Sequence, residues 1–494
     1  MPAPIGYTLP PQIDIIAGER SRPAVELHGA LADPNTGETL DRTRATSTDQ
    51  VYRAIAAADE AYRSGELGVD GVATRLQLLA AVADRLEAPD VVEAIAVADS
   101  VNTGLPLTLT RIFAGGNGNT FRSAAALLAA TPQREELPGA ASAADLHHVP
   151  WGPAAVLPPW NVPTATAAKK TAFALAAGCP VVLKPSEWAP SGSAVLADVI
   201  AEVIAEARLA PGMFQLVHGG AAVALLLAGD RRIRALCLTG GQAAGEAIAV
   251  ASARDMKALH LELGSNNPVI VRADADVDAT ADALVSGFTK LNGQWCESPG
   301  SVFVPAALER PLVDALLDRV RSLVVGDSFE EKTTLGPQSN IAQRDRLTAA
   351  IAGLAAAGGR VERAEVAVDL PGWFVAPTIV SGAPEQLTVD EIFGPVLTVH
   401  VARDGEEALR LANSRNTGLA GYVFSAAETA ARALAARIDA GEVKVNSTSV
   451  LDLAPGSTQA FWGRSGVGGH GDAQLLGFFQ GARIVGTDPP GLPI

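Results

Sequence analysis

The chain has 494 residues, 48% of them hydrophobic, and a formal net charge of −16. This length exceeds what a single hydrophobic core holds, so we expect two or three domains. The negative charge argues against nucleic acid as a partner, since phosphate binding needs clustered Lys and Arg. No apolar run approaches the length that spans a bilayer, and residues 1–20 lack the pattern of a secretory signal, so we expect a cytoplasmic protein without a membrane partner.

The cysteines and histidines exclude two further classes of structure. The three cysteines, Cys179, Cys237 and Cys296, are odd in number and far apart, which does not indicate a disulfide framework and leaves room for a working thiol. Cys237 falls inside a predicted strand and Cys179 in a buried turn, so we expect both to be inert. The seven histidines form no HxxxH pattern and the cysteines no CxxC pattern, so no metal site is expected.

Helices and strands alternate along most of the chain. Two amphipathic helices are predicted at 49–63 and 73–86, and two later helices at 310–324 and 344–357. Between them, short apolar runs predict strands at 154–157, 180–183, 214–218, 233–238 and 259–263, and Ala-rich stretches predict helices at 165–177, 191–207, 221–227 and 243–253. Gly178, shortly before Pro180, is typical of a helix C-terminal cap. The βαβ pattern predicts a parallel sheet covered on both faces, followed by a second α/β domain.

Polar motifs follow several of these strands, where ligands of parallel sheets bind. Asn161, within Pro158-Pro159-Trp160-Asn161-Val162-Pro163, could donate a hydrogen bond to a developing oxyanion, or cap the helix that follows. Lys184 and Glu187 could hold a nucleotide ribose, or form a solvated turn.

A Gly-rich turn and a cysteine loop complete the set. The run from Thr239 to Gly245 permits close backbone approach at a helix N-terminus, which suits a diphosphate, although the GxGxxG pattern is absent and a structural turn is the alternative. Cys296 lies in a loop containing Gly and Pro, where a thiolate could attack a carbonyl. Glu262 could then activate water as a general base, or be a solvated strand-end residue.

Together, in this order, the motifs resemble the aldehyde dehydrogenase superfamily. The match covers the chain from about residue 50 to near Gly468 and rests on PWNVP, KPSE, TGGxxxG, LELG, GQWC and EIFGPV. The resemblance implies an aldehyde dehydrogenase-like α/β fold: a Rossmann-type parallel-sheet cofactor domain (1–127 and 150–262), an α/β catalytic domain (263–465) and a small oligomerisation element (128–149 and 466–494). It implies an NAD(P)⁺-dependent oxidoreductase that converts an aldehyde to a carboxylic acid, and assembly as a homodimer or homotetramer.

The resemblance also assigns roles at the reaction centre. It implies that Cys296 is the nucleophile, that Asn161 and the backbone N–H of Cys296 form the oxyanion hole, and that Glu262 activates the water that hydrolyses a thioester on Cys296. The presence of Glu262 favours hydrolysis over transfer of the acyl group.

The cofactor residues follow from the same resemblance. Lys184 and Glu187 would hold the adenosine ribose, and Gly240 and Gly245 would frame the diphosphate. Because Glu187 would repel a 2′-phosphate, NAD⁺ is expected over NADP⁺, although Lys184 and the small Ser186 could also accommodate NADP⁺. At the other end of the cofactor, Glu391 would bind the nicotinamide ribose, with Phe393 and Trp160 beside the nicotinamide.

The sequence departs from the family where the tail of an aldehyde would be recognised. The usual Gly-Lys pair after LELG is Ser265-Asn266, and the usual PFGG segment is shortened to 460–463. The candidate substrate-pocket residues are Val162, Thr166, Lys169, Trp295, Glu297 and Trp462. Thr166 and Lys169 could form a polar or cationic wall suited to a carboxylate-bearing semialdehyde; alternatively, Lys169 pairs with Glu297 or points to solvent.

Two other classes of protein remain open at this point. A cysteine thioesterase or esterase would need a histidine base, for which His260 is the nearest in sequence. A non-catalytic protein that kept the fold would have no need of Asn161, Glu262 and Cys296 together.

Overall fold

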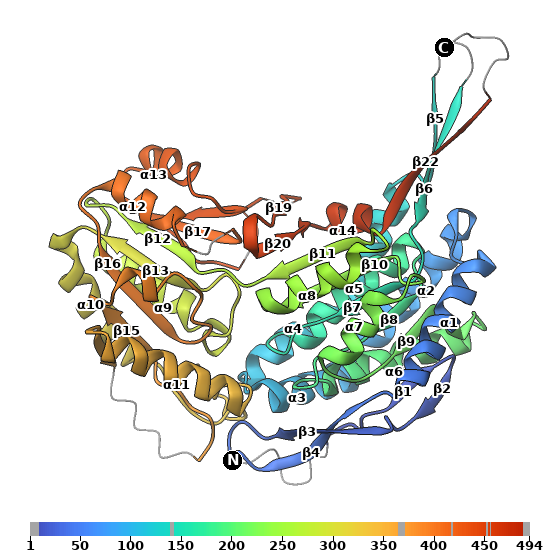
Figure 1. Cartoon of the computed structure of the whole chain (residues 1–494), viewed down its shortest axis with the longest axis horizontal. Coiled ribbons are helices and arrows are strands. Elements are labelled where there is room, and N and C mark those ends of the chain that lie inside the picture. Colours follow the sequence, from blue (N-terminus) through green and yellow to red (C-terminus); the bar gives the residue numbers. More distant parts are fainter. Residues whose placement is uncertain are drawn as a thin grey trace.

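The computed structural model describes residues 9–138, 143–363, 371–415, 418–450, 453–454 and 456–487. Figure 1 shows two helix-covered sheets side by side and a narrow three-stranded arm that extends from one of them. Within the described residues, no helix is both long enough and apolar enough to cross a membrane.

The first sheet has eight strands in the order β2-β1-β9-β8-β7-β10-β11-β20. Its five parallel strands are β7 (Ala154–Leu157), β8 (Val181–Leu183), β9 (Phe214–Leu216), β10 (Ala235–Gly240) and β11 (Ala258–Leu263). The helices between them are α5 (Pro163–Ala177), α6 (Ser191–Glu206), α7 (Ala221–Gly229) and α8 (Gln242–Ala253). These bounds confirm the predicted βαβ series to within two residues, and Gly178 caps α5 in the left-handed conformation as expected.

Side-chain alternation along these strands creates two cores. Val156 and Cys237 face the core that contains α5 and α6, whereas Ala155 and Leu236 face the core that contains α7. Because successive side chains of a strand point to opposite faces, continuously apolar strands can be buried on both sides. The sheet is thereby fixed in register, and its strand ends face a common edge.

The N-terminal region and the chain's C-terminal part complete this half of the molecule. The N-terminal region comprises β1 (Asp14–Ile16), β2 (Glu19–Ser21), β3 (Val25–Ala32), β4 (Thr39–Ala45), α1 (Thr48–Ser64), α2 (Val72–Leu86), α3 (Pro89–Thr103) and α4 (Leu107–Ala130). The C-terminal segment adds β20 (Gly466–Val467), which pairs with β11, and α14 (Asp472–Phe478), whose Leu475 and Leu476 enter the first core. Parts of the predicted oligomerisation element, β20 and α14, therefore contact the first sheet and its core.

The second sheet has the order β14-β15-β16-β13-β12-β17-β18. Its strands are β12 (Asn267–Val271), β13 (Pro299–Val304), β14 (Arg360–Arg363), β15 (Thr378–Ser381), β16 (Val396–Val401), β17 (Ala420–Phe424) and β18 (Glu442–Val445). Its helices are α9 (Val277–Phe288), α10 (Ala306–Val320), α11 (Ile341–Ala356), α12 (Gly405–Asn413) and α13 (Glu428–Ala435). The helix predicted at 310–324 is displaced by four residues at both ends, because its N-cap is Pro305 and the chain turns after Arg319.

The arm is an antiparallel sheet of β5 (Arg134–Leu137), β6 (Ala144–Pro150) and β22 (Gln480–Gly486), in the order β22-β6-β5. A separate short ladder pairs β19 (Gln459–Ala460) with β21 (Gly469–His470). The arm therefore brings together parts of 128–149 and 466–494, the two segments of the predicted oligomerisation element.

We predict that Gly178→Ala destabilises the protein more than Gly65→Ala does. Both glycines cap helices with positive φ, at 94° and 77°, so both substitutions incur about 1–2 kcal/mol of left-handed strain. At Gly178 an added Cβ would also lie 2.2 Å from the Leu67 carbonyl oxygen, whereas at Gly65 nothing lies within 4 Å. Urea or thermal denaturation of the two variants measures the difference. Equal denaturation midpoints for the two variants would contradict the expected clash with the Leu67 carbonyl oxygen.

Candidate active site

A cavity of about 390 Å³ lies where the carboxyl ends of the first sheet meet the second domain. Asn161 follows β7, and Glu262 lies near the end of β11, and both line this cavity together with Cys296 of the second domain. Three residues far apart in sequence thus line one cavity, at the sheet edge where ligands of parallel sheets bind.

Asn161 is buried and does not cap α5. The N-cap is Val162, without a side-chain cap bond, and the Asn161 Nδ2 donates instead to the Gln294 carbonyl oxygen at 2.7 Å. The amide therefore points at the loop that carries Cys296, which removes the capping interpretation.

The loop before Cys296 has an unusual backbone. Leu291, Asn292 and Gly293 all have positive φ, at 53°, 58° and 76°. An added Cβ at Gly293 would lie 2.0 Å from the Pro395 nitrogen. The strain is held by side chains: Asn292 Nδ2 donates to the carbonyl oxygens of Gly104 and Pro337 at 2.8 and 2.9 Å.

Asn267 fixes the other side of the same loop. Its Nδ2 donates to the carbonyl oxygens of Cys296 and Ser298, both at 2.8 Å, and its Oδ1 accepts from the Ala420 N–H at 3.0 Å. The backbone position of Cys296 is thus set by an anchored amide.

The three thiols differ in exposure. Cys179 and Cys237 are fully buried, and burial raises the pKa of each to about 12. Cys296 is partly exposed. Burial, followed by the charges of Glu262, Glu297 and Glu391, raises the pKa of Cys296 well above its ordinary value. Of the three thiols, Cys296 is therefore the accessible one.

Glu262 is buried and surrounded by donors. Its Oε2 lies 3.5 Å from Lys170 Nζ and accepts from Thr239 Oγ1 at 3.2 Å, and its Oε1 lies 3.4 Å from His470 Nε2. Burial by itself raises the pKa of Glu262, but the charges of His470 and Lys170 outweigh it and lower the pKa below its ordinary value. Glu262 is therefore a paired, ionised carboxylate rather than a solvated one.

One end of the cavity presents an ammonium and a carboxylate. Lys184 is buried, its Nζ donates to the Gly219 carbonyl oxygen and lies 4.0 Å from Glu187 Oε2, and burial lowers the pKa of Lys184. Leu238, Ala221 and Ala224 form an apolar wall beside them. A donor, an acceptor and a flat apolar wall suit a nucleoside.

The Gly-rich turn opens α8 towards the same cavity. Gly240 and Gly241 line it, the helix has no side-chain N-cap, and an added Cβ at Gly241 would meet nothing within 4 Å. The N–H groups at a helix N-terminus point outward and suit a diphosphate. Gly245 does not line the cavity; an added Cβ there would lie 2.5 Å from the Leu263 side chain, so this glycine permits α8 to pack on β11. The residues present therefore fit a dinucleotide.

The opposite end is formed by Glu391, Phe393 and Trp160. The rings of Trp160 and Phe393 meet edge to face with centroids 5.4 Å apart. Burial raises the pKa of Glu391 to about 8. An added Cβ at Gly264 would lie 2.2 Å from Glu391 Oε2, so glycine is required for this approach.

Asn266, where the family pattern has another residue, anchors the loop before Glu391. Its Nδ2 donates to the carbonyl oxygens of Thr388 and Val389 at 2.7 and 3.1 Å. The departure at 265–266 thus positions a cofactor-side residue.

The candidate substrate-pocket residues separate into two groups. Val162, Trp295 and Cys296 pack in one apolar cluster, which also contains Leu105, Leu109, Phe113 and Leu291. Glu297 is buried next to them in sequence, and Thr166 is half-buried on α5.

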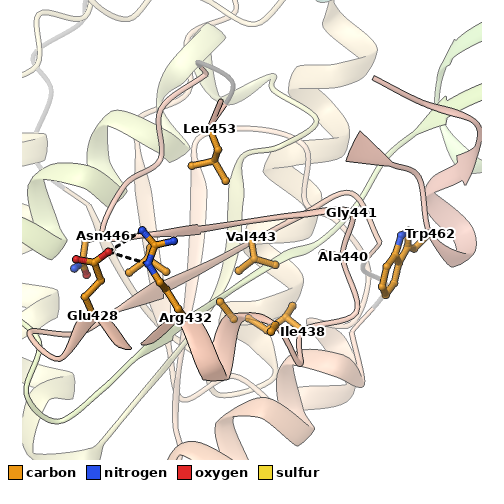
Figure 2. A pocket seen from close by; sticks show the side chains of 12 residues that line it. Glu428, Arg432, Ile438, Ala440, Gly441, Val443, Asn446, Leu453 and Trp462 are labelled. Atoms are coloured by element: carbon orange, nitrogen blue, oxygen red, sulfur yellow. Dashed lines mark hydrogen bonds and ion pairs between the residues drawn. The ribbon is translucent and has the colours of Figure 1, made fainter. Parts of the chain in front are cut away.

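Lys169 and Trp462 lie elsewhere, which corrects their expected place. The Lys169 side chain is 40% exposed and its Nζ lies 3.3 Å from Asp472 Oδ1, so it neither faces the pocket nor pairs with Glu297. Trp462 borders a separate pocket of about 560 Å³ with Arg432, Ile438 and Val443 (Figure 2). The cationic wall expected from Lys169 is not formed.

Lys170 and His470 contact Glu262 but were missed in the sequence. Lys170 lies three residues after Ala167 and four before Ala174, both buried on α5, and this helical spacing could have placed it on the inner face. His470 lies in a Gly-rich segment, and nothing in its spacing points to Glu262.

His260 does not serve as a base for Cys296. It is fully buried, its Nε2 lies 2.9 Å from the Gly469 carbonyl oxygen, and burial lowers its pKa to about 3. Nothing here favours the thioesterase interpretation. Among the described residues, no group of three or more His, Cys, Asp or Glu is arranged to hold a metal ion.

Comparisons with known proteins agree with this geometry. The aldehyde dehydrogenase family model matches residues 26–485. Geranial dehydrogenase of Castellaniella defragrans is 31% identical over 97% of this chain and 99% of its own, and succinate-semialdehyde dehydrogenase [NADP(+)] 1 of Mycobacterium tuberculosis is 33% identical over 85% and 92%. Betaine aldehyde dehydrogenase from Staphylococcus aureus, solved in complex with NAD⁺, superposes with a TM-score of 0.90 at 26% identity, covering 98% of this chain and 96% of that one. The chain belongs to the aldehyde dehydrogenase family, whose members oxidise aldehydes to carboxylic acids with a nicotinamide dinucleotide.

Proposed function

We propose that Cys296, Asn161 and Glu262 are the residues with which this chain oxidises its aldehyde. The observation that carries the proposal is that all three line one cavity, whose other walls suit a dinucleotide. Cys296 is the nucleophile, Asn161 the oxyanion donor and Glu262 the base for hydrolysis.

The first step uses the Cys296 thiolate and the Asn161 amide. Sulfur attack on the carbonyl carbon places negative charge on the substrate oxygen, which fixed N–H donors stabilise. Asn161 Nδ2 lies against the Gln294 carbonyl, two residues before Cys296, and the backbone N–H of Cys296 is the second donor. A bound nicotinamide dinucleotide supplies the hydride acceptor and is held by Lys184, Glu187, Gly240 and Glu391.

The second step releases the acid from a thioester on Cys296. Glu262 takes a proton from water, the water oxygen bonds to the acyl carbon, and the carbon–sulfur bond breaks to return the thiolate. Because the Lys170 ammonium lies 3.5 Å from Glu262 and the pKa of Glu262 lies below its ordinary value, the carboxylate is available as a base at neutral pH.

Substitution of Glu262 and Cys296 separates these steps. Glu262→Gln should still form about one equivalent of reduced nicotinamide per site in a rapid burst, after which turnover falls by about 10²- to 10⁴-fold, because only hydrolysis loses its base. Cys296→Ser should abolish both phases. Stopped-flow absorbance of reduced nicotinamide measures them. Loss of the burst in Glu262→Gln would contradict the assigned role of Glu262.

For the cofactor, we propose NAD⁺ rather than NADP⁺. Glu187 lines the nucleoside end of the cavity, where its charge would oppose a 2′-phosphate. Glu187→Gln keeps the size of the side chain and removes that charge. We expect kcat/KM for NADP⁺ relative to NAD⁺ to rise about 10-fold, which corresponds to about 1.4 kcal/mol. An unchanged ratio would exclude Glu187 as the discriminating residue.

For the substrate, we propose an aldehyde with an uncharged apolar tail. The side chains packed around Cys296 are Leu105, Leu109, Phe113, Val162, Leu291 and Trp295. These side chains offer hydrophobic burial to an apolar tail.

One observation favours a carboxylate-bearing semialdehyde as the second candidate. Lys290 Nζ lies 4.3 Å from the centre of the Trp295 ring and 2.8 Å from the Thr448 carbonyl oxygen, so a cation stands at that wall. Lys290, not Lys169, would then receive the carboxylate.

A pair of lysine substitutions decides between the two substrates. If Lys290 binds a carboxylate, Lys290→Met should lower kcat/KM for succinic semialdehyde relative to butanal by about 10-fold, a loss of about 1.4 kcal/mol. Lys169→Met is the matched control and should leave the ratio unchanged. If neither variant changes the ratio and butanal is preferred throughout, the apolar candidate stands alone.

The arm and the sheet edges support a proposal of assembly as a homodimer or homotetramer. Ile484 and Val485 of β22 and Leu137 of β5 are exposed on the arm, and β18 is the outermost strand of the second sheet. Exposed apolar strands and open edges favour pairing with another chain.

For the location of the protein, we propose the cytoplasm. A working thiol at Cys296 fits that reducing compartment.

A further inference from the structure

Glu262 has to lose the proton that it takes from water before it can act again. Its side chain is 9% exposed, so the proton needs a neighbouring acceptor. Among the residues that the structure describes, three side chains contact its two oxygens: Thr239, Lys170 and His470.

Only one of the three can accept that proton. Lys170 is an ammonium with three donor hydrogens and no lone pair, and its side chain is only 5% exposed. The Thr239 hydroxyl donates to Glu262 Oε2. A neutral imidazole has one unprotonated ring nitrogen, and His470 Nε2 lies 3.4 Å from Glu262 Oε1.

His470 also joins the buried site to the surface. Its side chain is 31% exposed, against 9% for Glu262. His260, the other histidine nearby, is fully buried and its Nε2 is occupied by the Gly469 carbonyl. Glu297 is buried too and offers no outlet. Among the side chains that contact Glu262, His470 is therefore the one whose ring is partly exposed to solvent.

The position of His470 is fixed by its surroundings. β21 pairs with β19 so that His470 lies opposite Gln459, and the His470 ring meets the Phe461 ring edge to face with centroids 5.0 Å apart. The His260 contact to Gly469 holds the residue before it. The shortened 460–463 segment is part of this support.

We propose that His470 is a relay residue that takes the water-derived proton from Glu262 and releases it to solvent; this rests on the hydrolytic role proposed for Glu262. Glu262 accepts one proton as the water oxygen bonds to the acyl carbon. That proton passes from Glu262 Oε1 to His470 Nε2, and the imidazolium then loses a proton to bulk water. The thiolate leaves unprotonated, so both groups are restored.

An acetyl thioester on Cys296 tests the relay without any nicotinamide. Treatment with p-nitrophenyl acetate acylates the thiol, and the loss of the acetyl mass from the intact chain gives the hydrolysis rate directly. His470→Asn and His470→Lys should each slow that loss by about 10-fold or more, because neither residue accepts a proton at neutral pH. His470→Lys keeps a cation near Glu262, so a purely charge-pairing role would leave its rate near that of the native protein.

Added imidazole distinguishes a proton relay from structural support. Imidazole should restore much of the hydrolysis rate in His470→Ala. It should not do so in Glu262→Gln; a faster rate there would mean that imidazole acts directly on the thioester. His148→Asn is the matched control, since His148 Nε2 also lies 3.4 Å from a carboxylate, Glu135, and is 30% exposed, but on the arm. It should hydrolyse at the native rate.

The outcomes separate the two proposals. The relay would be overturned if His470→Asn hydrolysed the thioester at the native rate, or if His470→Lys alone did so. It would also be overturned if imidazole failed to restore the rate in His470→Ala. If the acetyl group does not form on Cys296, or if Glu262→Gln hydrolyses as fast as the native protein, the proposed function itself fails.

Discussion

Glu262 is a carboxylate buried at a strand end, and burying an unpaired charge is costly unless it is matched by an opposite charge and hydrogen bonds. Lys170 from α5 provides the opposite charge, and Thr239 and His470 also contact the carboxylate oxygens. The pairing links the helix after β7, the strand β11 and the C-terminal segment at one point. The proposed role of Glu262 as a base depends on this pairing, which holds the carboxylate in place before substrate enters.

The second requirement is that Cys296 reach this base from the other domain. Three consecutive positive φ values turn the loop sharply before the cysteine, and Asn267 and Asn292 hold the turn through four side-chain bonds to carbonyl groups. The cost of the backbone strain is offset by these buried hydrogen bonds. The same loop brings the Gln294 carbonyl to Asn161, so one segment positions both the proposed nucleophile and the proposed oxyanion donor.

The sequence predicted the parallel sheet well, because β7 to β11 are apolar on both faces and are separated by helices with clear ends, such as the Gly178 cap of α5. It also predicted the residues at the strand ends, since the carboxyl ends of parallel strands share an edge. It could not place residues whose contacts depend on distant segments. The family resemblance makes Lys169 a pocket candidate, with solvent exposure as the alternative; in the structure Lys169 is 40% exposed and pairs with Asp472, and the next residue, Lys170, contacts Glu262. His470 reaches Glu262 only through the β19–β21 ladder, which has no local signal.

The central claim is that the acyl group of the substrate is carried by Cys296 while Glu262 removes it. Peptide mapping by mass spectrometry of Glu262→Gln, after reaction with an aldehyde and NAD⁺, tests it most directly. The account predicts the acyl mass on the peptide that contains Cys296 and on no other, in proportion to the reduced nicotinamide formed. Reduced nicotinamide without an acyl group on that peptide, or an acyl group on another residue, would contradict it.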